Sequence, residues 1–519
     1  MQRLPIENPT IAEILNDLGR LQKSRIIQLD VSRRSVVTDH DAFKAKVLEI
    51  LPSREVCQQS LDLYFDHWET IFRIVHIDDF KSLVHTHLEA DRLMDLDLTI
   101  LVQTVLMIAI GSQKFDMRSQ IHTPFAQDAC TLVKGYLDNR SSKTRHSLVT
   151  LQTWTLLVLT YQVFLIPAEQ LWLETGHLVR HAMVIGLHRD PSAARTISPY
   201  AGELRRRLWA TILEFDLQAS LSYGMPMAIT RCATSCQIPS NIPDAMLKYD
   251  CLELPEGKPD NEWTDSCLLR NLAQSRGSRM KIVQRLADKG ANMDTGDMYS
   301  LWLKLLRLLQ NHRLFFDRRK KLEQPRGQLG SRLYQTHLLH AFMEITQRRH
   351  LQNASLGSDT SLTIAAKETV FLYADIYRDS RLSSKKDGDY EDKNRTCGGI
   401  YMVMARGAAL LAGFILCSMT NSTQVATTFV SNELSQATFE ENGENVRILL
   451  SALASGLPCI GLKGVARLAV ALQSVEYDQE MKEEDLFTKM RAELLPFAKP
   501  CRRMLEGMPE TSSEGASRG

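Results

Sequence analysis

Apolar residues recur at steps of three and four along most of the chain, the spacing that places them on one face of an α-helix. Polar stretches or Gly and Pro residues separate these amphipathic segments. Few windows alternate between apolar and polar residues at a period of two, as the strands of a large sheet would. The pattern therefore predicts an all-α protein, folded as a large multi-helix bundle or superhelical array. Helices are expected near residues 56–73, 77–92, 96–114, 125–138, 147–166, 296–321, 331–350, 361–379, 398–419, 434–455, 460–474 and 480–506.

The same pattern divides the chain into three parts. Residues 1–50 are expected to form an N-terminal helical arm and linker, in which 11–22 has the spacing of a short amphipathic helix and is a candidate dimerisation helix. A polar stretch at 28–40 follows as the linker. Residues 51–507 are expected to form the helical body, and 508–519 a tail that is disordered by composition.

The most informative part of the chain lies between residues 168 and 244. Its first helix carries two adjacent apolar stripes, which predicts burial over most of its circumference. Gly176 stands in the middle of this helix, where glycine costs about 1 kcal/mol relative to alanine. We therefore expect a neighbouring helix to approach closely at Gly176. The helix is expected to end within the segment Gly186–Pro191, because proline cannot continue it.

A second helix follows, for which Ser198 is the expected N-cap and Pro199 the first helical residue. We expect this helix to end at Gly224. Glu203 stands four residues before Arg207, an order that predicts a weak ion pair on an exposed face, worth roughly a few tenths of a kcal/mol.

Three consecutive arginines, Arg205–Arg207, lie in this second helix and fan over about 200° of its circumference. They cannot share one surface or one ligand. We interpret them as surface charges together with a buried ion pair to Glu214, Asp216 or Asp190, rather than as a grip on DNA phosphates.

Several motifs occur in order along this part of the chain. An opening motif at residues 64–80 reads Y-F-x-x-W-x-x-I-F-x-I-x-H-x-x-x-F, and 176–190 reads G-x-x-x-R-x-A-x-x-x-G-L-H-R-D. Residues 203–209 read E-x-R-R-R-L-W. Together they resemble the middle homology region of fungal zinc-cluster transcription factors, best over residues 52–250, and the resemblance implies that 51–507 is a regulatory domain of that type. The motif residues, most of them expected to be structural, are Gly176, Arg180, Gly186, His188, Arg189, Asp190, Arg205, Arg206, Trp209, Asp216, Gly224 and Pro226.

The resemblance implies a transcriptional regulator that acts in the nucleus on a metabolic gene cluster, with secondary-metabolite clusters as one candidate. Members of that family usually carry a zinc cluster of six cysteines with two CxxC pairs, whereas this sequence has no CxxC and only Cys57 before residue 100. The resemblance then implies indirect contact with DNA through a zinc-cluster partner, as a homo- or heterodimer, with a small molecule as candidate effector. Ala210 and Met225 depart from residues that are common in the family, Trp and Arg respectively.

Charge and composition argue against two classes of protein, nucleic-acid-binding proteins and membrane proteins. The chain has 62 Lys and Arg against 61 Asp and Glu, a net charge of +1. A domain that neutralises nucleic-acid phosphates usually shows a clear basic excess. Scattered cysteines and the polar N-terminal segment predict a soluble intracellular protein, and every apolar run falls short of the roughly 20 residues that span a bilayer. We expect no contact with a membrane.

Patterns for catalysis or metal binding are weak. The sequence contains no HExxH, GxSxG or phosphate-binding glycine motif, so we expect neither an enzyme nor a cofactor. His177 and His181 have a helical metal-binding spacing, but a third ligand is not in view and we interpret them as packing residues. Asp91, Asp95 and Asp97 are spaced too loosely for the magnesium–diphosphate site of an all-helical terpenoid enzyme.

A basic tetrad, Arg318, Arg319, Lys320 and Lys321, ends a long predicted helix. It is a candidate nuclear-import signal, and the alternative is a solvated helix end that suits the helix dipole. Two other function classes stay open: a helical ligand-sensing protein without a role at DNA, and, less favoured, an all-helical enzyme.

Overall fold

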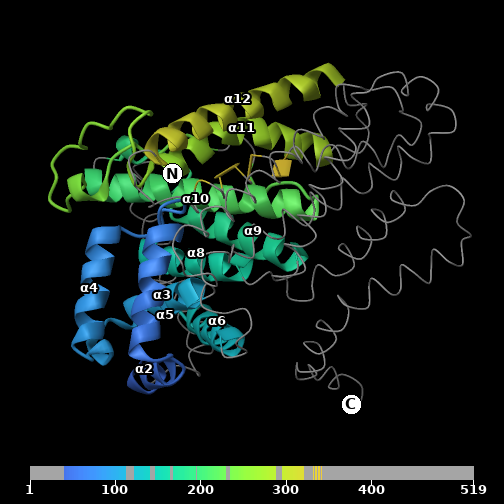
Figure 1. Ribbon diagram of the computed structural model, residues 1–519. Coiled ribbons are helices and arrows are strands. Elements are labelled where there is room, and N and C mark those ends of the chain that lie inside the picture. Colours follow the sequence, from blue (N-terminus) through green and yellow to red (C-terminus); the bar gives the residue numbers. More distant parts are fainter. Residues whose placement is uncertain are drawn as a thin grey trace, which may run out of the picture.

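The computed structural model describes residues 40–112, 122–140, 146–163, 168–194, 196–229, 234–287 and 295–320, together with several positions between 331 and 341. All regular elements in these residues are helical, and no strand occurs among them (Figure 1). The predicted all-α class is confirmed. The α-helices are α2 (His40–Glu49), α3 (Arg54–Leu63), α4 (Ile77–Glu89), α5 (Leu98–Ser112), α6 (His122–Asp138), α8 (Leu148–Val163), α9 (Ala168–Val184), α10 (Pro199–Tyr223), α11 (Cys267–Ala287) and α12 (Thr295–Lys320).

Helix α5 is the centre of the N-terminal half. All of its residues except Ile100 are buried. This follows from a sequence that is apolar around the whole circumference, since such a helix is stable only when other elements enclose it. Helices α3, α6 and α8 pack around α5, and α2 also contacts it.

From α8 onward, each helix packs against the next along the chain: α8 on α9, α9 on α10, α10 on α11, and α11 on α12. Helix α10 is 25 residues long. It crosses the molecule between α8 and α9 on one side and α11 and α12 on the other (Figure 1). One long helix therefore joins two layers, and its side chains are available to both.

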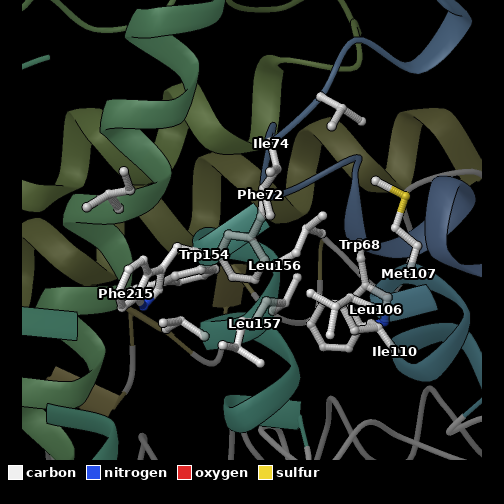
Figure 2. Packing of buried hydrophobic residues seen from close by; sticks show 14 of the residues in the cluster. Trp68, Phe72, Ile74, Leu106, Met107, Ile110, Trp154, Leu156, Leu157 and Phe215 are labelled. Atoms are coloured by element: carbon white, nitrogen blue, oxygen red, sulfur yellow. The ribbon is translucent and has the colours of Figure 1, made fainter. Parts of the chain in front are cut away.

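Aromatic side chains join the opening motif to α10. Figure 2 shows Trp68 and Phe72 in the same core as Trp154 of α8 and Phe215 of α10. The rings of Phe72 and Phe215 make an edge contact with their centroids 4.9 Å apart. Trp68 is the last residue of a π-helical turn, η1 (Tyr64–Trp68), which directly follows α3. The apolar residues of the opening motif are thus core residues.

The ends of α10 are those that the sequence predicts. The hydroxyl oxygen of Ser198 accepts a hydrogen bond from the amide of Ala201 at 3.2 Å. Pro199 is the first helical residue, and Gly224 terminates the helix with φ of 70°. The left-handed conformation is easily adopted by glycine because it has no Cβ.

Close backbone packing occurs at Gly111 rather than at Gly176. A Cβ at Gly111 would lie 1.9 Å from the carbonyl oxygen of Ser60, so α5 and α3 approach each other too closely for any side chain there. At Gly176 the one side chain of the described residues within 4 Å of such a Cβ is that of Arg180, whose Nη1 lies at 3.0 Å and belongs to the same helix. The expected neighbouring helix at Gly176 is therefore wrong.

Helices α2 and α11 are not among the helices predicted from sequence. α2 falls in the segment expected to be arm and linker, and its Val47 is buried in the main core. The expected helix at 11–22, most of the linker at 28–40, the helices predicted beyond residue 350 and the tail at 508–519 lie outside the described residues. Within the described part of the chain, no helix combines the length and apolar character required to span a bilayer.

Candidate functional site

Residues 234–247 form an irregular segment, here called the strap, that is hydrogen-bonded to charged side chains of α10. Outside a helix, backbone amides and carbonyls need partners of their own. The amide of Ser240 donates to Oε1 of Glu203 at 3.0 Å, and Nη2 of Arg207 donates to the carbonyl oxygen of Ile242 at 2.9 Å. Two charged residues of the 203–209 motif therefore hold the strap.

The first part of the strap docks on the loop between α9 and α10. Arg206 binds Asp190 through two hydrogen bonds, Nε to Oδ2 at 3.0 Å and Nη2 to Oδ1 at 2.7 Å. Oδ2 of Asp190 also accepts from the amide of Gln237 at 2.9 Å. The bonds from Arg206 hold the pKa of Asp190 well below its usual range. Asp190 thus links α10 to the strap as a carboxylate.

The backbone and a buried indole complete this contact. The carbonyl oxygen of His188 accepts from the hydroxyl of Thr234 at 3.0 Å and from the amides of Ser235 and Cys236 at 3.0 and 3.2 Å. The indole N–H of Trp209 donates to Oγ1 of Thr234 at 3.0 Å. His188 therefore acts in this contact through its backbone and Trp209 through its side chain.

Asp244 ties the far end of the strap to the opening motif. Its side chain is 1% exposed. Arg73 and Arg207 both donate to Oδ1, the latter from Nη1 at 2.6 Å, while the amide of Ile77 donates to Oδ2 at 2.7 Å. Burial by itself would raise the pKa of Asp244, but Arg73, Arg207 and the nearby His76 lower it well below its usual range. One carboxylate therefore joins α10, the strap and the start of α4.

Glu69 organises the backbone of the opening motif. It is fully buried and accepts from the amides of Ile74 at 2.6 Å and Val75 at 2.8 Å, and from the hydroxyl of Tyr64. Burial raises the pKa of Glu69 to about 7, against the attraction of Arg73. Its bonds to two backbone amides hold the turn between η1 and α4.

A separate buried network lies between α10 and α11. Arg279 donates to both carboxylate oxygens of Glu214, at 2.6 and 2.8 Å. Gln218 donates to Oε1 of Glu214 at 2.9 Å, and its amide oxygen lies 3.0 Å from Nδ1 of His340. Nδ1 of His337 lies 3.4 Å from Glu214. The partner of Glu214 is thus Arg279, so Glu214 is not the one of the three candidate carboxylates that pairs with the arginine triad.

The C-terminal end of α10 holds a turn by different contacts. The amide of Ala228 donates to Oδ2 of Asp216 at 2.9 Å. The carbonyl oxygen of Pro226 accepts from the indole N–H of Trp172 at 3.0 Å and from the hydroxyl of Ser220 at 3.3 Å. Burial raises the pKa of Asp216 to about 7. Asp216 pairs with a backbone amide here, so it is not the candidate carboxylate that pairs with the triad either.

The remaining motif residues lie in the middle of α9 and at the turn that follows it. Nη1 of Arg180 donates to the carbonyl oxygen of Gly176 at 2.9 Å. Gly186 has φ of 82°, and Nη2 of Arg205 donates to the carbonyl oxygen of Ile185 beside it at 2.6 Å. Gly186 and the bond from Arg205 lie where the chain turns from α9 into the loop that carries Asp190.

The three arginines of the triad bind three different sets of partners, as their angular spread predicts. Arg205 binds a backbone carbonyl, Arg206 binds Asp190, and Arg207 binds Glu203 and Asp244. Asp190 is the one of the three candidate carboxylates that pairs with the triad, through Arg206. The expected exposed pair of Glu203 and Arg207 is wrong, because both side chains are buried beneath the strap. Arg189 is exposed.

The weaker candidates do not form a site among the described residues. No group of three or more His, Cys, Asp or Glu there could hold a metal ion. His181 packs its ring on Trp154 at 4.8 Å, and Asp95 pairs with Arg92 at 2.7 Å. Of the basic tetrad, residues 318–320 belong to α12, whereas Lys321 lies outside the described residues.

Sequence reasoning missed Arg73, Asp244 and Arg279 as partners in these networks. A usable signal existed for Arg73, a single charge between Phe72 and Ile74 in an apolar run. A charge in such a run is buried with its neighbours and needs a counter-charge. The partner, however, lies 171 positions away in sequence.

A comparison with protein families finds one match, the fungal specific transcription factor domain, over residues 61–289. This range contains α4 to α11, the strap and the motif residues of all the networks described above. The match coincides with most of the region that the sequence motifs mark as similar, residues 52–250.

The chain is also similar to named fungal transcription factors. It is 31% identical over 283 residues to the transcription factor opdR of Penicillium oxalicum, covering 53% of this chain and 34% of that protein. It is 29% identical over 201 residues to the transcription factor lepE of Aspergillus flavus, covering 38% and 24%. It is 26% identical over 247 residues to the equisetin cluster transcription factor eqxF of Fusarium heterosporum, covering 45% and 35%. The chain spans about a third or less of these relatives. No solved structure matches it.

Proposed function

We propose that this chain is a nuclear transcriptional regulator of a metabolic gene cluster and a member of the family of proteins with a fungal specific transcription factor domain. The observation that carries the proposal is the family match over residues 61–289. Some of the similar proteins are named for the clusters of fusarisetin A and equisetin. This naming supports a gene cluster, and a secondary-metabolite cluster in particular, as the target.

The helical body serves as the regulatory and interaction part of the protein. Its motif residues hold the strap and the turn after α10 in place. Arg206 and Arg207, which could otherwise contact phosphates, are already bonded to Asp190 and Asp244. A guanidinium that is bound to a carboxylate has few free N–H donors, and its charge is already neutralised, so it binds a phosphate weakly. This supports a body that contacts other proteins or an effector rather than DNA.

DNA is reached through a zinc-cluster partner, bound as a homo- or heterodimer. The 519 residues contain no CxxC pair, and their net charge of +1 provides no basic excess. Weak intrinsic DNA affinity follows, because phosphate neutralisation supplies most of non-specific binding. A specific dissociation constant of about 10⁻⁸ M or tighter for the purified chain, at physiological salt, would contradict this part of the proposal.

Chromatin immunoprecipitation tests the proposal directly. The chain is tagged at its native locus, its size is recorded and its location is followed by fluorescence. We expect nuclear signal and promoter enrichment at the size of this chain, which supports recruitment by a partner. Enrichment with a larger product would place DNA binding in a further segment of the same protein. Absence of enrichment, in cells where the protein is abundant, would overturn the regulator proposal.

A further inference from the structure

Residues 245–257, which begin within the last residues of the strap, form a loop held at both ends. At one end Asp244 is fixed by its buried bonds to Arg73 and Arg207. At the other end the amide of Lys258 donates to the carbonyl oxygen of Asn241 at 2.8 Å. The two ends therefore close on neighbouring residues of the strap, as in an Ω-loop.

Asn241 is the residue that closes this loop. Its side-chain amide donates to the carbonyl oxygens of Lys258, Pro259 and Glu262 at 3.2, 2.9 and 3.0 Å, and its amide oxygen accepts from the hydroxyl of Thr264 at 2.6 Å. Asn241 is itself 3% exposed. A buried side chain that makes four such bonds gives the loop a defined base, although the loop has no helix or strand over most of its length.

This fixed loop presents large apolar side chains to solvent. Met246 is 44% exposed, Tyr249 81% and Leu252 92%, at steps of three residues. The ring of Tyr249 contacts the ring of Tyr200 edge-on at 5.6 Å. Several strongly exposed apolar side chains on one short segment, whose base is buried and bonded, are typical of interaction sites rather than of the general surface.

Acidic side chains alternate with these apolar ones. Asp250, Glu253 and Glu256 are all exposed, and Lys248 is the one basic residue between positions 245 and 257. Asp79, whose side chain is 62% exposed, accepts a hydrogen bond from the hydroxyl of Tyr200. The exposed part of this loop is therefore both apolar and negatively charged, and Asp79 adds a further carboxylate beside Tyr200.

The negative charge of the loop determines which class of partner can bind to it. A nucleic acid would be repelled by the acidic residues of the loop. A second copy in a two-fold contact would bring the same acidic residues against each other. A protein groove that is apolar inside and bordered by Lys and Arg matches both the shape and the sign of the loop.

We propose that the 245–257 loop is a docking surface that inserts Tyr249 and Leu252 into the apolar groove of a partner protein with a Lys- and Arg-rich rim. Tyr249 and Leu252 supply the buried anchor contacts, since a few such side chains carry most of the energy of an interface. Asp250, Glu253 and Glu256 face the basic rim and speed association. In the proposed regulator, on which this inference rests, the partner is a protein through which the chain acts on transcription.

A transcriptional reporter tests the loop. The full chain is fused to an unrelated DNA-binding domain and compared with the double variant Tyr249→Ser/Leu252→Ser. We expect the fusion to activate the reporter and the variant to lose about tenfold of that output, as expected when an anchor pair is removed from an interface. The triple variant Asp250→Lys/Glu253→Lys/Glu256→Lys should also lose most of the output.

The matched control is Leu173→Ser/Val184→Ser, which removes two other exposed apolar side chains, 56% and 67% exposed on α9. This control should keep full output, and all variants should melt within about 2 °C of the parent, because the side chains that they change are exposed. Unchanged output from the loop variants would overturn the docking surface, and so would a parent fusion that fails to activate. Promoter enrichment by immunoprecipitation decides separately whether the chain is a regulator at all.

A crosslink identifies the partner chemistry. A photoreactive benzoylphenylalanine in place of Leu252 is expected to attach, in cells, to a peptide in which apolar residues stand next to Lys or Arg. Crosslinks to a second copy of this chain or to DNA would overturn the proposed occupant.

Discussion

The two ends of helix α10 each hold a neighbouring segment with an aspartate, but the chemistry differs. Asp244 of the strap and Asp216 of α10 are both buried, at 1% and 0% exposure. The pKa of Asp244 is lowered well below its usual range, whereas the pKa of Asp216 is raised to about 7. Depth of burial therefore does not set the charge state in this fold.

The charge state of each carboxylate depends instead on how close the guanidinium groups lie to it. Asp244 contacts both Arg73 and Arg207. Glu203 has Arg207 at 3.3 Å, and this longer contact does not offset burial, so the pKa of Glu203 is raised. Asp216 takes its bonds from backbone amides, while Arg180, one of whose nitrogens is bonded to a carbonyl oxygen, attracts it only electrostatically. The strap end of α10 is thus held by full charges, and the opposite end by a group that titrates near neutrality.

Removing the central carboxylate of the strap should have the largest effect. Asp244→Ala leaves two buried guanidiniums without their counter-charge, and we expect a loss of about 3–5 kcal/mol in the free energy of unfolding at pH 7. Because the folded pKa of Asp244 is below the unfolded value, this stability is present above about pH 4 and is lost as the pH falls further. Denaturant unfolding at pH 7 and near pH 3 measures both.

Asp260→Ala is the matched control. Asp260 also pairs with an arginine, Arg270 at 2.7 Å, but its side chain is 56% exposed. The control should lose less than about 1 kcal/mol, since exposed ion pairs contribute little. Equal losses in the two variants would refute the view that buried charge pairing holds the strap.

Local signals made one part of this arrangement predictable from sequence. The caps at Ser198 and Gly224 depend on neighbouring residues only, and so does the divergence of the three arginines, which follows from 100° per residue. Asp190 was one of the three carboxylates considered as partners of the triad, and the loop between α9 and α10 brings it to Arg206. Asp190 and Arg206 are only 16 positions apart in sequence.

Contacts distant in sequence were not predictable in the same way. Arg73 and Asp244 meet only because the strap returns across the opening motif, and no periodicity encodes that return. Helix α11 was missed because its apolar pattern is interrupted by charged residues such as Arg279, which is fully buried against Glu214. A polar residue in the core is invisible to a hydrophobic pattern until its partner is known.

At the other end of α10, neutralising the aspartate should stabilise the protein at alkaline pH. In Asp216→Asn the side-chain oxygen still accepts from Ala228, but no buried charge forms. Because the folded pKa of Asp216 is raised to about 7, the parent loses stability as the pH rises from about 4 to 7. We expect the variant to match the parent near pH 4 and to exceed it by roughly 1–3 kcal/mol at pH 8.

Unfolding at pH 4, 6 and 8 measures this difference between the two proteins. Glu69 also titrates near pH 7, so it contributes the same slope to both and cancels in the comparison. If the variant and the parent had the same free energy of unfolding at every pH, ionisation of Asp216 would not destabilise the folded protein. The contrast between the two ends of α10 would then fail.

The caps of α10 should give the smallest effect and test whether its two ends are equally dependent on local structure. Ser198→Ala removes the hydrogen bond to the amide of Ala201, and we expect a loss of about 1 kcal/mol. Ser198→Asp should restore it, because a carboxylate accepts the same bond and suits the positive end of the helix dipole. Gly224→Ala places a Cβ in the left-handed conformation and should cost about 1–2 kcal/mol. If either cap variant destabilised the protein as much as Asp244→Ala, helix termination rather than charge pairing would dominate the difference between the two ends.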